Sequence, residues 1–269
     1  MNSTLKKYIE IFVPDKLYLP LVFFYNKFLG KHEYELFIIE KFFNKKRTFI
    51  DIGANRGIYS YYFSNIFDSV ETFEPISEIT FHLSSLKKSN IRIHNVGLSN
   101  KNYSDTLYIP IENNNLLTPL ASLNKISDFN SIERKIPIRT LDSYNFRDVD
   151  FIKIDVEGNE LNVIEGAKEI IKKFKPVLLI EIEQRHIKTK MESIFDFILK
   201  LGYEGCFYNE KKFFSISEFD YTIHQEKFLK DPDNKEASRG MAYVLFQSHQ
   251  HAQTAVMRLS ERPEAALSI

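Results

Sequence analysis

The feature that most constrains this chain is the run Thr48–Ile58, in which an apolar stretch leads directly into a turn that contains Gly53 and Gly57. The apolar stretch predicts a short buried strand, and a helix follows the turn. Glycine lets the chain turn sharply, so that backbone N–H groups and the helix N-terminus face a ligand. The run therefore predicts a cofactor site of the nucleotide-binding type.

Two acidic residues refine this interpretation. Glu74 ends the next predicted strand, about 20 residues after the turn, where a carboxylate can bind both hydroxyls of a ribose. Asp51 precedes the turn and would repel the pyrophosphate of a dinucleotide, and the Gly-x-Gly-x-x-Gly pattern is absent. A carboxylate at this position suits a ligand with a cationic amino-acid end. S-adenosylmethionine has both that end and an adenosine.

Strand-like and helix-like segments alternate along the chain, which predicts an α/β fold with a doubly wound, mostly parallel sheet that is covered by helices on both faces. The expected strands are Thr48–Ile52, Val70–Phe73, Ile91–Asn95, Phe151–Ile154, Val177–Glu183 and Met241–Phe246, and the expected helices are Ile58–Phe67, Ser77–Ser89, Leu161–Lys173 and Met191–Leu201. The carboxyl ends of parallel strands share one edge of the sheet. Ligands bind at that edge.

Composition narrows the function classes. The chain has 269 residues with 43% hydrophobic content and no formal net charge, so one large domain is expected and nucleic acid is not a favoured partner. The one cysteine, Cys206, excludes an internal disulfide and indicates a reducing compartment, and without an evident signal peptide we expect a cytoplasmic protein. The apolar stretch 17–25 is too short to span a membrane, and fits a lid or packing helix or a weak membrane-surface contact.

The domain organisation follows from shifts in sequence pattern. We expect an N-terminal helical or lid segment over residues 1–46, the catalytic domain over 47–247, and an atypical tail over 248–269. The part up to residue 236 contains three alanines and all 26 lysines, whereas residues 237–269 contain six alanines and no lysine or asparagine, which suggests a different origin. Between residues 97 and 150 the pattern weakens, and one edge pair is expected around Ser104–Ile111 and Arg134–Thr140.

A second motif places carboxylates at the carboxyl end of the strand Phe151–Ile154. Asp155 closes the strand, Glu157 follows it, and Glu181 or Glu183 ends the next strand. Together they could bind a divalent cation such as Mg²⁺ through oxygen ligands, or hydrogen-bond a polyhydroxy substrate. Acids at the start of the following helix also favour its positive end, which gives Glu157 a purely structural alternative.

His186 lies just beyond the strand Val177–Glu183, at the same edge of the sheet. Neighbouring acids raise the pKa of an imidazole toward working pH, where it can take a proton from a hydroxyl. The alternative is an exposed loop histidine. We predict His186 and Asp155 as the catalytic residues.

These motifs occur together in an order that resembles the FkbM family of S-adenosylmethionine-dependent methyltransferases. The matching blocks are Asp51-Ile-Gly-Ala-Asn-Arg-Gly57, Phe73-Glu-Pro75, Asn95-Val-Gly-Leu98, Thr140-Leu-Asp142, Ile152-Lys-Ile-Asp-Val-Glu-Gly158 and Leu179-Ile-Glu181, which span about half of the chain. The resemblance implies a class I methyltransferase fold with a seven-stranded sheet and methyl transfer to oxygen. It implies that Asp51, Gly53, Ala54, Asn55 and Gly57 surround the methionine end of the cofactor, that Glu74 binds the ribose, that Asn95 and Val96 lie near the adenine, and that Asp155 faces the methyl group.

Family members are commonly associated with polyketide or surface-polysaccharide biosynthesis, so the leading acceptor is a sugar hydroxyl in a surface-glycan precursor or nucleotide-linked sugar. The bias toward asparagine, lysine and isoleucine suggests an AT-rich bacterial genome. The alternatives are a small natural product, a protein side chain, or a non-catalytic S-adenosylmethionine-binding module. A homo-oligomer is compatible with the aromatic residues near the N-terminus.

Overall fold

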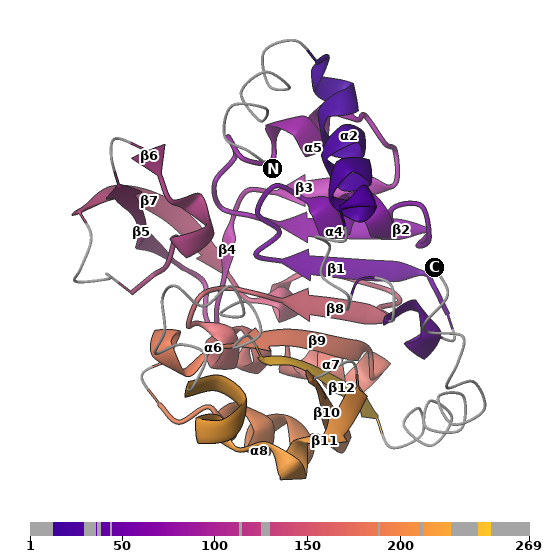
Figure 1. Cartoon of the computed structure of the whole chain (residues 1–269), viewed down its shortest axis with the longest axis vertical. Coiled ribbons are helices and arrows are strands. Elements are labelled where there is room, and N and C mark those ends of the chain that lie inside the picture. The colour runs from indigo at the N-terminus through magenta and orange to yellow at the C-terminus, as the bar shows by residue number, and fades with distance from the viewer. Residues whose placement is uncertain are drawn as a thin grey trace.

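The computed structural model describes residues 13–29, 36, 39–43, 45–112, 115–124, 130–187, 189–209, 212–226 and 242–248. Its centre is an eight-stranded sheet, shown edge to edge in Figure 1, with the strand order β11-β10-β12-β9-β8-β1-β2-β3. The strands are β1 (Thr48–Ile52), β2 (Ser69–Phe73), β3 (Ile91–His94), β8 (Phe151–Ile154), β9 (Val177–Ile182), β10 (Tyr203–Asn209), β11 (Lys212–Ser215) and β12 (Ala242–Ser248). Neighbours from β3 to β9 are parallel, whereas β12 is antiparallel to both β9 and β10.

The doubly wound α/β fold is confirmed, but the expected number of seven strands is wrong. Strand β11 is the addition: it pairs antiparallel with β10 and extends the sheet at that edge. The C-terminal strand, predicted as Met241–Phe246, is confirmed as β12 and lies between β9 and β10. The sheet therefore combines distant parts of the chain at its β9 to β10 side.

Alternating side chains of the sheet build two apolar cores, one on each face. Phe49 and Phe151 belong to the core that packs against α2 (Asp15–Phe28), η1 (Ile39–Phe42) and α4 (Ile58–Phe63). Their chain neighbours Ile50 and Ile152 belong to the core on the other face, against α6 (Glu160–Glu165), α7 (Lys168–Phe174) and α8 (Glu192–Lys200). This alternation explains why the central strands read as continuous apolar runs, since both of their faces are buried.

The helix expected over Leu161–Lys173 is divided into α6 and α7 at Gly166. A Cβ at Gly166 would lie 2.1 Å from the carbonyl oxygen of Ser99, so the chain at Gly166 packs closely against the backbone of Ser99 and Asn100. The helix expected over Ser77–Ser89 is shorter, as α5 (Phe81–Ser85). Short helical turns complete the described chain: η2 (Thr118–Leu120), η3 (Leu141–Ser143), η4 (Gln184–His186), η5 (Ile216–Glu218) and η6 (Thr222–Glu226).

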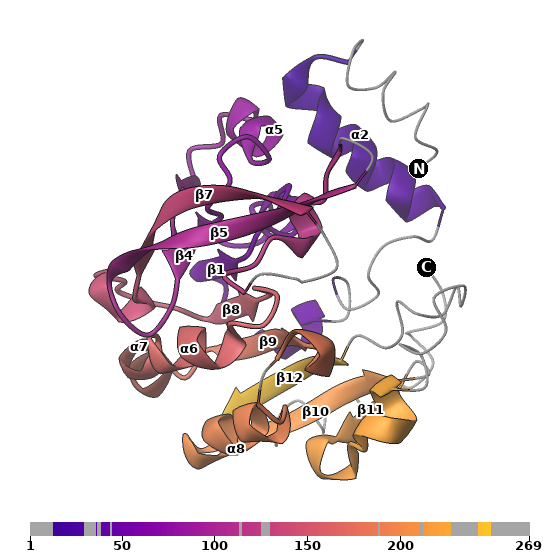
Figure 2. The same ribbon diagram turned by 90° about the vertical axis from the view of Figure 1, so that its left-hand side faces the viewer.

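A second, smaller sheet projects beside the carboxyl edge of the main sheet, as Figures 1 and 2 show. It has the order β4-β7-β5-β6 and consists of β4 (Gly97–Leu98), β5 (Tyr103–Glu112), β6 (Asn115–Leu116) and β7 (Asn130–Arg139). The predicted edge pair is confirmed, because β5 and β7 are antiparallel partners, but they form a separate sheet. Its buried residues, which include Ile109 and Ile138, form a core of their own.

The N-terminal segment contributes α2, which contacts α4 and α5 on one side of the molecule (Figure 2). Within the described ranges, no helix is both long enough and apolar enough to cross a membrane. The predictions for residues 1–12 and for the tail beyond Ser248 lie outside the described residues. The division at residues 46 and 247 stays a prediction.

Candidate functional site

The turn after β1 is the first part of the site. Gly53, Asn55 and Gly57 all have positive φ angles, of 71°, 50° and 81°. A Cβ at Gly53 would lie 1.6 Å from the carbonyl oxygen of Asp155, so the absence of a side chain lets the turn lie directly against the end of β8. Gly57 is the residue before α4, as the predicted glycine turn requires.

Glu74 is held at the turn by two backbone groups. Its Oε2 accepts from the N–H of Asn55 at 2.9 Å, and its Oε1 accepts from the N–H of Ile76 at 2.9 Å. Burial raises the pKa of Glu74 to about 7, and these two hydrogen bonds oppose that rise. The Oδ1 atom of Asn55 is buried and has no hydrogen-bond partner within the described structure. The turn therefore presents a fixed carboxylate and an unused acceptor.

Asp51 lies behind the turn and not on the pocket wall. Its Oδ2 accepts from the N–H and the hydroxyl of Ser60, at 3.0 and 2.6 Å, which ties β1 to α4. Its Oδ1 is 3.9 Å from Nζ of Lys153, a lysine that is only 3% exposed. Burial raises the pKa of Asp51, against the lowering effects of Lys153 and Ser60.

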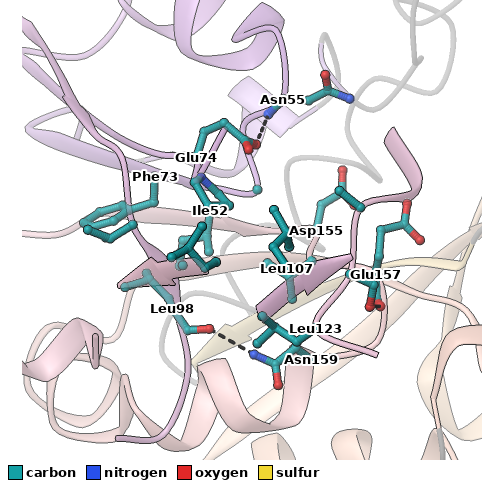
Figure 3. A pocket seen from close by; sticks show the side chains of 18 of the residues that line it. Ile52, Asn55, Phe73, Glu74, Leu98, Leu107, Leu123, Asp155, Glu157 and Asn159 are labelled. Atoms are coloured by element: carbon teal, nitrogen blue, oxygen red, sulfur yellow. Dashed lines mark hydrogen bonds between the residues drawn. The ribbon is translucent and has the colours of Figure 1, made fainter. Parts of the chain in front are cut away.

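A cavity of about 280 Å³ lies between the turn, the carboxyl ends of the central strands and the small sheet (Figure 3). Its walls combine carboxylates and amides with aliphatic side chains. They are Ile52, Gly53, Asn55, Phe73, Glu74, Pro75, Val96, Gly97, Leu98, Leu107, Thr118, Ala121, Ser122, Leu123, Ile136, Asp155, Val156, Glu157, Asn159 and Glu181. A concave site in which polar groups converge beside apolar walls is typical of small-molecule binding.

The structure brings most of the predicted site residues together in this cavity. The residues on its wall are Gly53, Asn55, Glu74, Val96, Asp155, Glu157 and Glu181. The predicted residues that do not line the cavity are Asp51, Ala54, Gly57, Asn95 and His186. Asn95 still contacts a wall residue, because its Nδ2 donates to the backbone oxygen of Glu74 at 3.0 Å.

Sequence reasoning missed two parts of the site. One is the contribution of the small sheet and its connections, such as Leu107 and Ser122, because nothing in a polar, asparagine-rich segment indicates which residues turn inward. The other is Lys153. Its signal was available, since a lysine in the middle of the apolar strand Phe151–Ile154 requires a buried counter-charge.

The cation site expected from Asp155, Glu157 and Glu181 is not supported. Across the parts of the chain that the structure describes, no group of three or more His, Cys, Asp or Glu side chains is arranged to hold a metal ion. The carboxylates of Asp155 and Glu157 have protein partners of their own. Asp155 accepts from Nζ of Lys153 at 2.9 Å, and Glu157 pairs with His186.

His186 lies between two carboxylates. Its Nε2 is 3.1 Å from Oε2 of Glu157 and 3.2 Å from Oε2 of Glu183, which is 5% exposed. Burial lowers the pKa of His186, but the hydrogen bond to Glu183 and the charge of Glu157 outweigh it, so that the net shift is upward. Burial raises the pKa of Glu157 to about 7, and His186 opposes that rise.

Glu160, the first residue of α6, is a buried acid that should make the free energy of unfolding depend on pH. It is 3% exposed, its Oε1 accepts from the N–H of Gly158 at 2.9 Å, and burial raises its pKa to about 7 from an ordinary value of 4.5. The folded protein therefore retains a proton that the unfolded chain releases, and the stabilisation is lost as the pH rises from about 4.5 through 7. Glu160→Gln should make this fall shallower, by at most about 3 kcal/mol.

Urea unfolding at a series of pH values between 4.5 and 8 measures this effect. Glu169→Gln is the matched control, because Glu169 is exposed on α7 and its removal should leave the slope unchanged. An unaltered pH dependence in Glu160→Gln would contradict the assignment. Glu74 and Glu157, whose pKa values are raised in the same direction, should supply the remaining slope.

The chain was compared with protein-family models and with curated protein sequences. A model of the methyltransferase FkbM domain matches residues 51–204, which is more than half of the chain. No curated protein sequence matches the chain.

Similar solved structures include a methyltransferase FkbM from Methylobacillus flagellatus KT, with 19% identity and a TM-score of 0.46 over 75% of this chain and 43% of that one. The chain thus spans less than half of that protein. Another is SMU.1697c, a putative methyltransferase from Streptococcus mutans in complex with SAH, with 11% identity and a TM-score of 0.44 over 80% of this chain and 98% of that one. An rRNA methylase from Streptococcus thermophilus has 9% identity and a TM-score of 0.43 over 80% and 92% of the two chains.

These structural similarities are too distant to assign residue roles. The family match, in contrast, starts at Asp51, contains the turn, Glu74 and the strand ends that form the cavity, and ends in β10. Without the added β11, the main sheet has the seven strands that the resemblance implied, in the order β3-β2-β1-β8-β9-β12-β10. The chain therefore belongs to the FkbM family of S-adenosylmethionine-dependent methyltransferases.

Proposed function

We propose that this protein transfers a methyl group from S-adenosylmethionine to a hydroxyl group of a sugar, in a surface-glycan precursor or a nucleotide-linked sugar. The observation that carries the proposal is the side-by-side position of the cofactor turn and three carboxylates, those of Asp155, Glu157 and Glu181, on one cavity wall. Carboxylates are strong acceptors for the hydroxyl groups of a sugar.

The residues at the turn fit the cofactor. Glu74 would bind the ribose hydroxyls, because its carboxylate is fixed by two backbone N–H groups and lines the cavity. The buried, unpartnered Oδ1 of Asn55 would accept from the amino group of the methionine end. Val96, with Phe73 and Leu98, would contact the adenine. When bound, S-adenosylmethionine supplies a methyl group that its sulfonium makes reactive.

The remaining walls suit the acceptor. The small sheet contributes aliphatic residues, among them Leu107 and Ile136, to the cavity that the carboxylates also line. A sugar has C–H groups that can pack on such a surface, as well as hydroxyls that can bind the acids.

The residues of this chain accelerate the reaction mainly by holding the reactants in line and by excluding water. Lys153 fixes the carboxylate of Asp155 at the end of β8, so that this side chain cannot rotate freely. Asp155 stays our prediction for the residue beside the reacting methyl group. The proton of the acceptor hydroxyl must also be removed, because a sugar hydroxyl is a poor nucleophile at neutral pH.

Calorimetry with S-adenosylmethionine and its demethylated product tests the cofactor part of the proposal. We expect micromolar binding of both by the full chain, and binding at least tenfold weaker in Glu74→Gln, in which one ribose acceptor is lost. Glu78→Gln, an exposed position near the same loop, is the matched control.

Transfer of a radiolabelled methyl group to separate panels of monosaccharides, nucleotide-linked sugars, phenolic natural products and peptides tests the acceptor. Product with a sugar panel supports the proposal. Product only with phenols or peptides would replace the acceptor class, and cofactor binding without transfer to any panel would indicate a binding module.

A further inference from the structure

Glu157 occupies a backbone position that side chains rarely adopt. Its φ is 53°, and Gly158 follows with a φ of 101°. A Cβ at Gly158 would lie 2.2 Å from the carbonyl oxygen of His186, so the turn lies directly against η4. From the other side, the hydroxyl of Ser122 donates to the carbonyl oxygen of Glu157 at 2.8 Å. A strained residue that is fixed from two sides, next to a cavity, is a candidate for a functional role.

The side chain of Glu157 lies between the cavity and the imidazole of His186. The carboxylate lines the cavity, and its Oε2 is 3.1 Å from Nε2 of His186. The buried carboxylate of Glu183 lies 3.2 Å from the same Nε2 and also contacts Arg185, whose Nε donates to that nitrogen at 2.9 Å. In Figure 3, Glu157 and Asp155 come from the same strand end and both lie along the cavity. Both carboxylates therefore face the same imidazole nitrogen, and of the two residues it is Glu157 that lines the cavity.

We propose that Glu157 is the catalytic base that removes the proton of the acceptor hydroxyl, and that His186 is a positioning residue that holds the Glu157 carboxylate toward the cavity. This inference rests on the proposed function. It changes the role that the sequence suggested for His186, which acts through Glu157 because it does not itself line the cavity.

In the proposed step, a methyl group replaces the proton on the acceptor oxygen. The acceptor oxygen forms a bond to the methyl carbon while the carbon–sulfur bond breaks and its electron pair stays on sulfur. The O–H proton passes to the carboxylate of Glu157. The products are the methyl ether, S-adenosylhomocysteine and a protonated Glu157, which then releases its proton to solvent.

The charges around Glu157 suit this role. Burial, together with the negative charges of Asp155, Glu183 and Glu160, raises the pKa of its carboxyl to about 7, against the effect of His186. A base is most effective when its pKa lies near the working pH. Burial and Arg185 lower the pKa of His186, whereas the hydrogen bond to Glu183 and the charges of Glu157 and Glu183 raise it, and the net shift is upward.

Kinetics with a sugar acceptor from the panels above test the inference. We expect Glu157→Gln to lower kcat by at least 100-fold while the affinity for S-adenosylmethionine, measured by calorimetry, stays within twofold. His186→Gln should lower kcat about tenfold and move the acidic limb of the kcat profile to higher pH, because the pKa of Glu157 rises without the imidazolium. Glu169→Gln, exposed on α7, is the control for loss of a carboxylate.

The same pair can be tested without an acceptor, by NMR titration of the full chain with labelled carboxyl and imidazole groups. Glu157→Gln should lower the pKa of His186, and His186→Gln should raise that of Glu157. Independent titration of the two groups would overturn the inference. So would full activity of Glu157→Gln, or a kcat loss in His186→Gln as large as in Glu157→Gln. If the wild-type protein methylates no sugar, the proposed function itself fails.

Discussion

Replacing Gly53 by alanine should abolish cofactor binding and lower the free energy of unfolding by about 4 kcal/mol or more. The new Cβ would lie 1.6 Å from the carbonyl oxygen of Asp155 and 2.7 Å from its carbonyl carbon. Both are backbone atoms, so no side chain can rotate away, and β1 would have to separate from β8, its partner in the sheet. Calorimetric titration with S-adenosylmethionine and urea unfolding measure the two effects.

Gly202→Ala is the matched control for this variant. Gly202 also has a positive φ, of 84°, but the nearest atom to its added Cβ is Nζ of Lys175, at 3.7 Å. The control should therefore show only the cost of the left-handed backbone, about 1–2 kcal/mol, with cofactor binding unchanged. A Gly53→Ala protein with a native circular dichroism spectrum and wild-type affinity would refute the packing argument.

Lys153→Met should have the second largest effect, a loss of about 3–5 kcal/mol in the free energy of unfolding. The ammonium group contacts the carboxylate of Asp155 at 2.9 Å and lies 3.9 Å from that of Asp51, which is fully buried. Methionine has a similar volume but no charge, so the buried Asp51 would lose the cation that opposes its desolvation. Urea unfolding near pH 7 measures the loss.

A double variant separates this electrostatic effect from packing. Lys153→Met with Asp51→Asn should recover part of the lost stability, because no uncompensated charge then stays buried at this position. Lys172→Met is the control for removal of a lysine: Lys172 is half exposed and forms only a surface pair with Glu169, so its loss should cost less than about 1 kcal/mol. Equal losses in the buried and the exposed variant would contradict the assignment.

The central strands could be predicted because their sequence signal is local. Both faces of β1 and β8 are buried, so their residues form short apolar runs that end at a glycine turn or an acid, and their predicted bounds agree with the structure. Strand β11 could not be predicted from such a run. It exists because it pairs with β10 across a short connection, and this pairing depends on where the edge of the sheet lies.

The site, like the fold, could be predicted only in part from the sequence. Glu74 and Asp155 follow strands directly, and the parallel arrangement brings such positions to one edge. The face of the sheet to which each side chain points was not predicted correctly in every case. Asp51 is one residue before the end of β1 and therefore points to the α4 face, where it accepts from Ser60, instead of toward the ligand. The metal hypothesis failed for a related reason, since the sequence does not indicate that Lys153 and His186 pair with two of the three acids.

The position of β12 has a consequence for how the protein is made. The strand forms ladders with β9 on one side and β10 on the other, yet it includes some of the last residues that the structure describes. During synthesis, β1, β2, β3, β8 and β9 can pair soon after they leave the ribosome, whereas β10 and β11 cannot join the sheet until residue 248 is available. The nascent chain must therefore protect the open edge of β9, and the turn, Glu74 and the end of β8 can assemble before the sheet is closed.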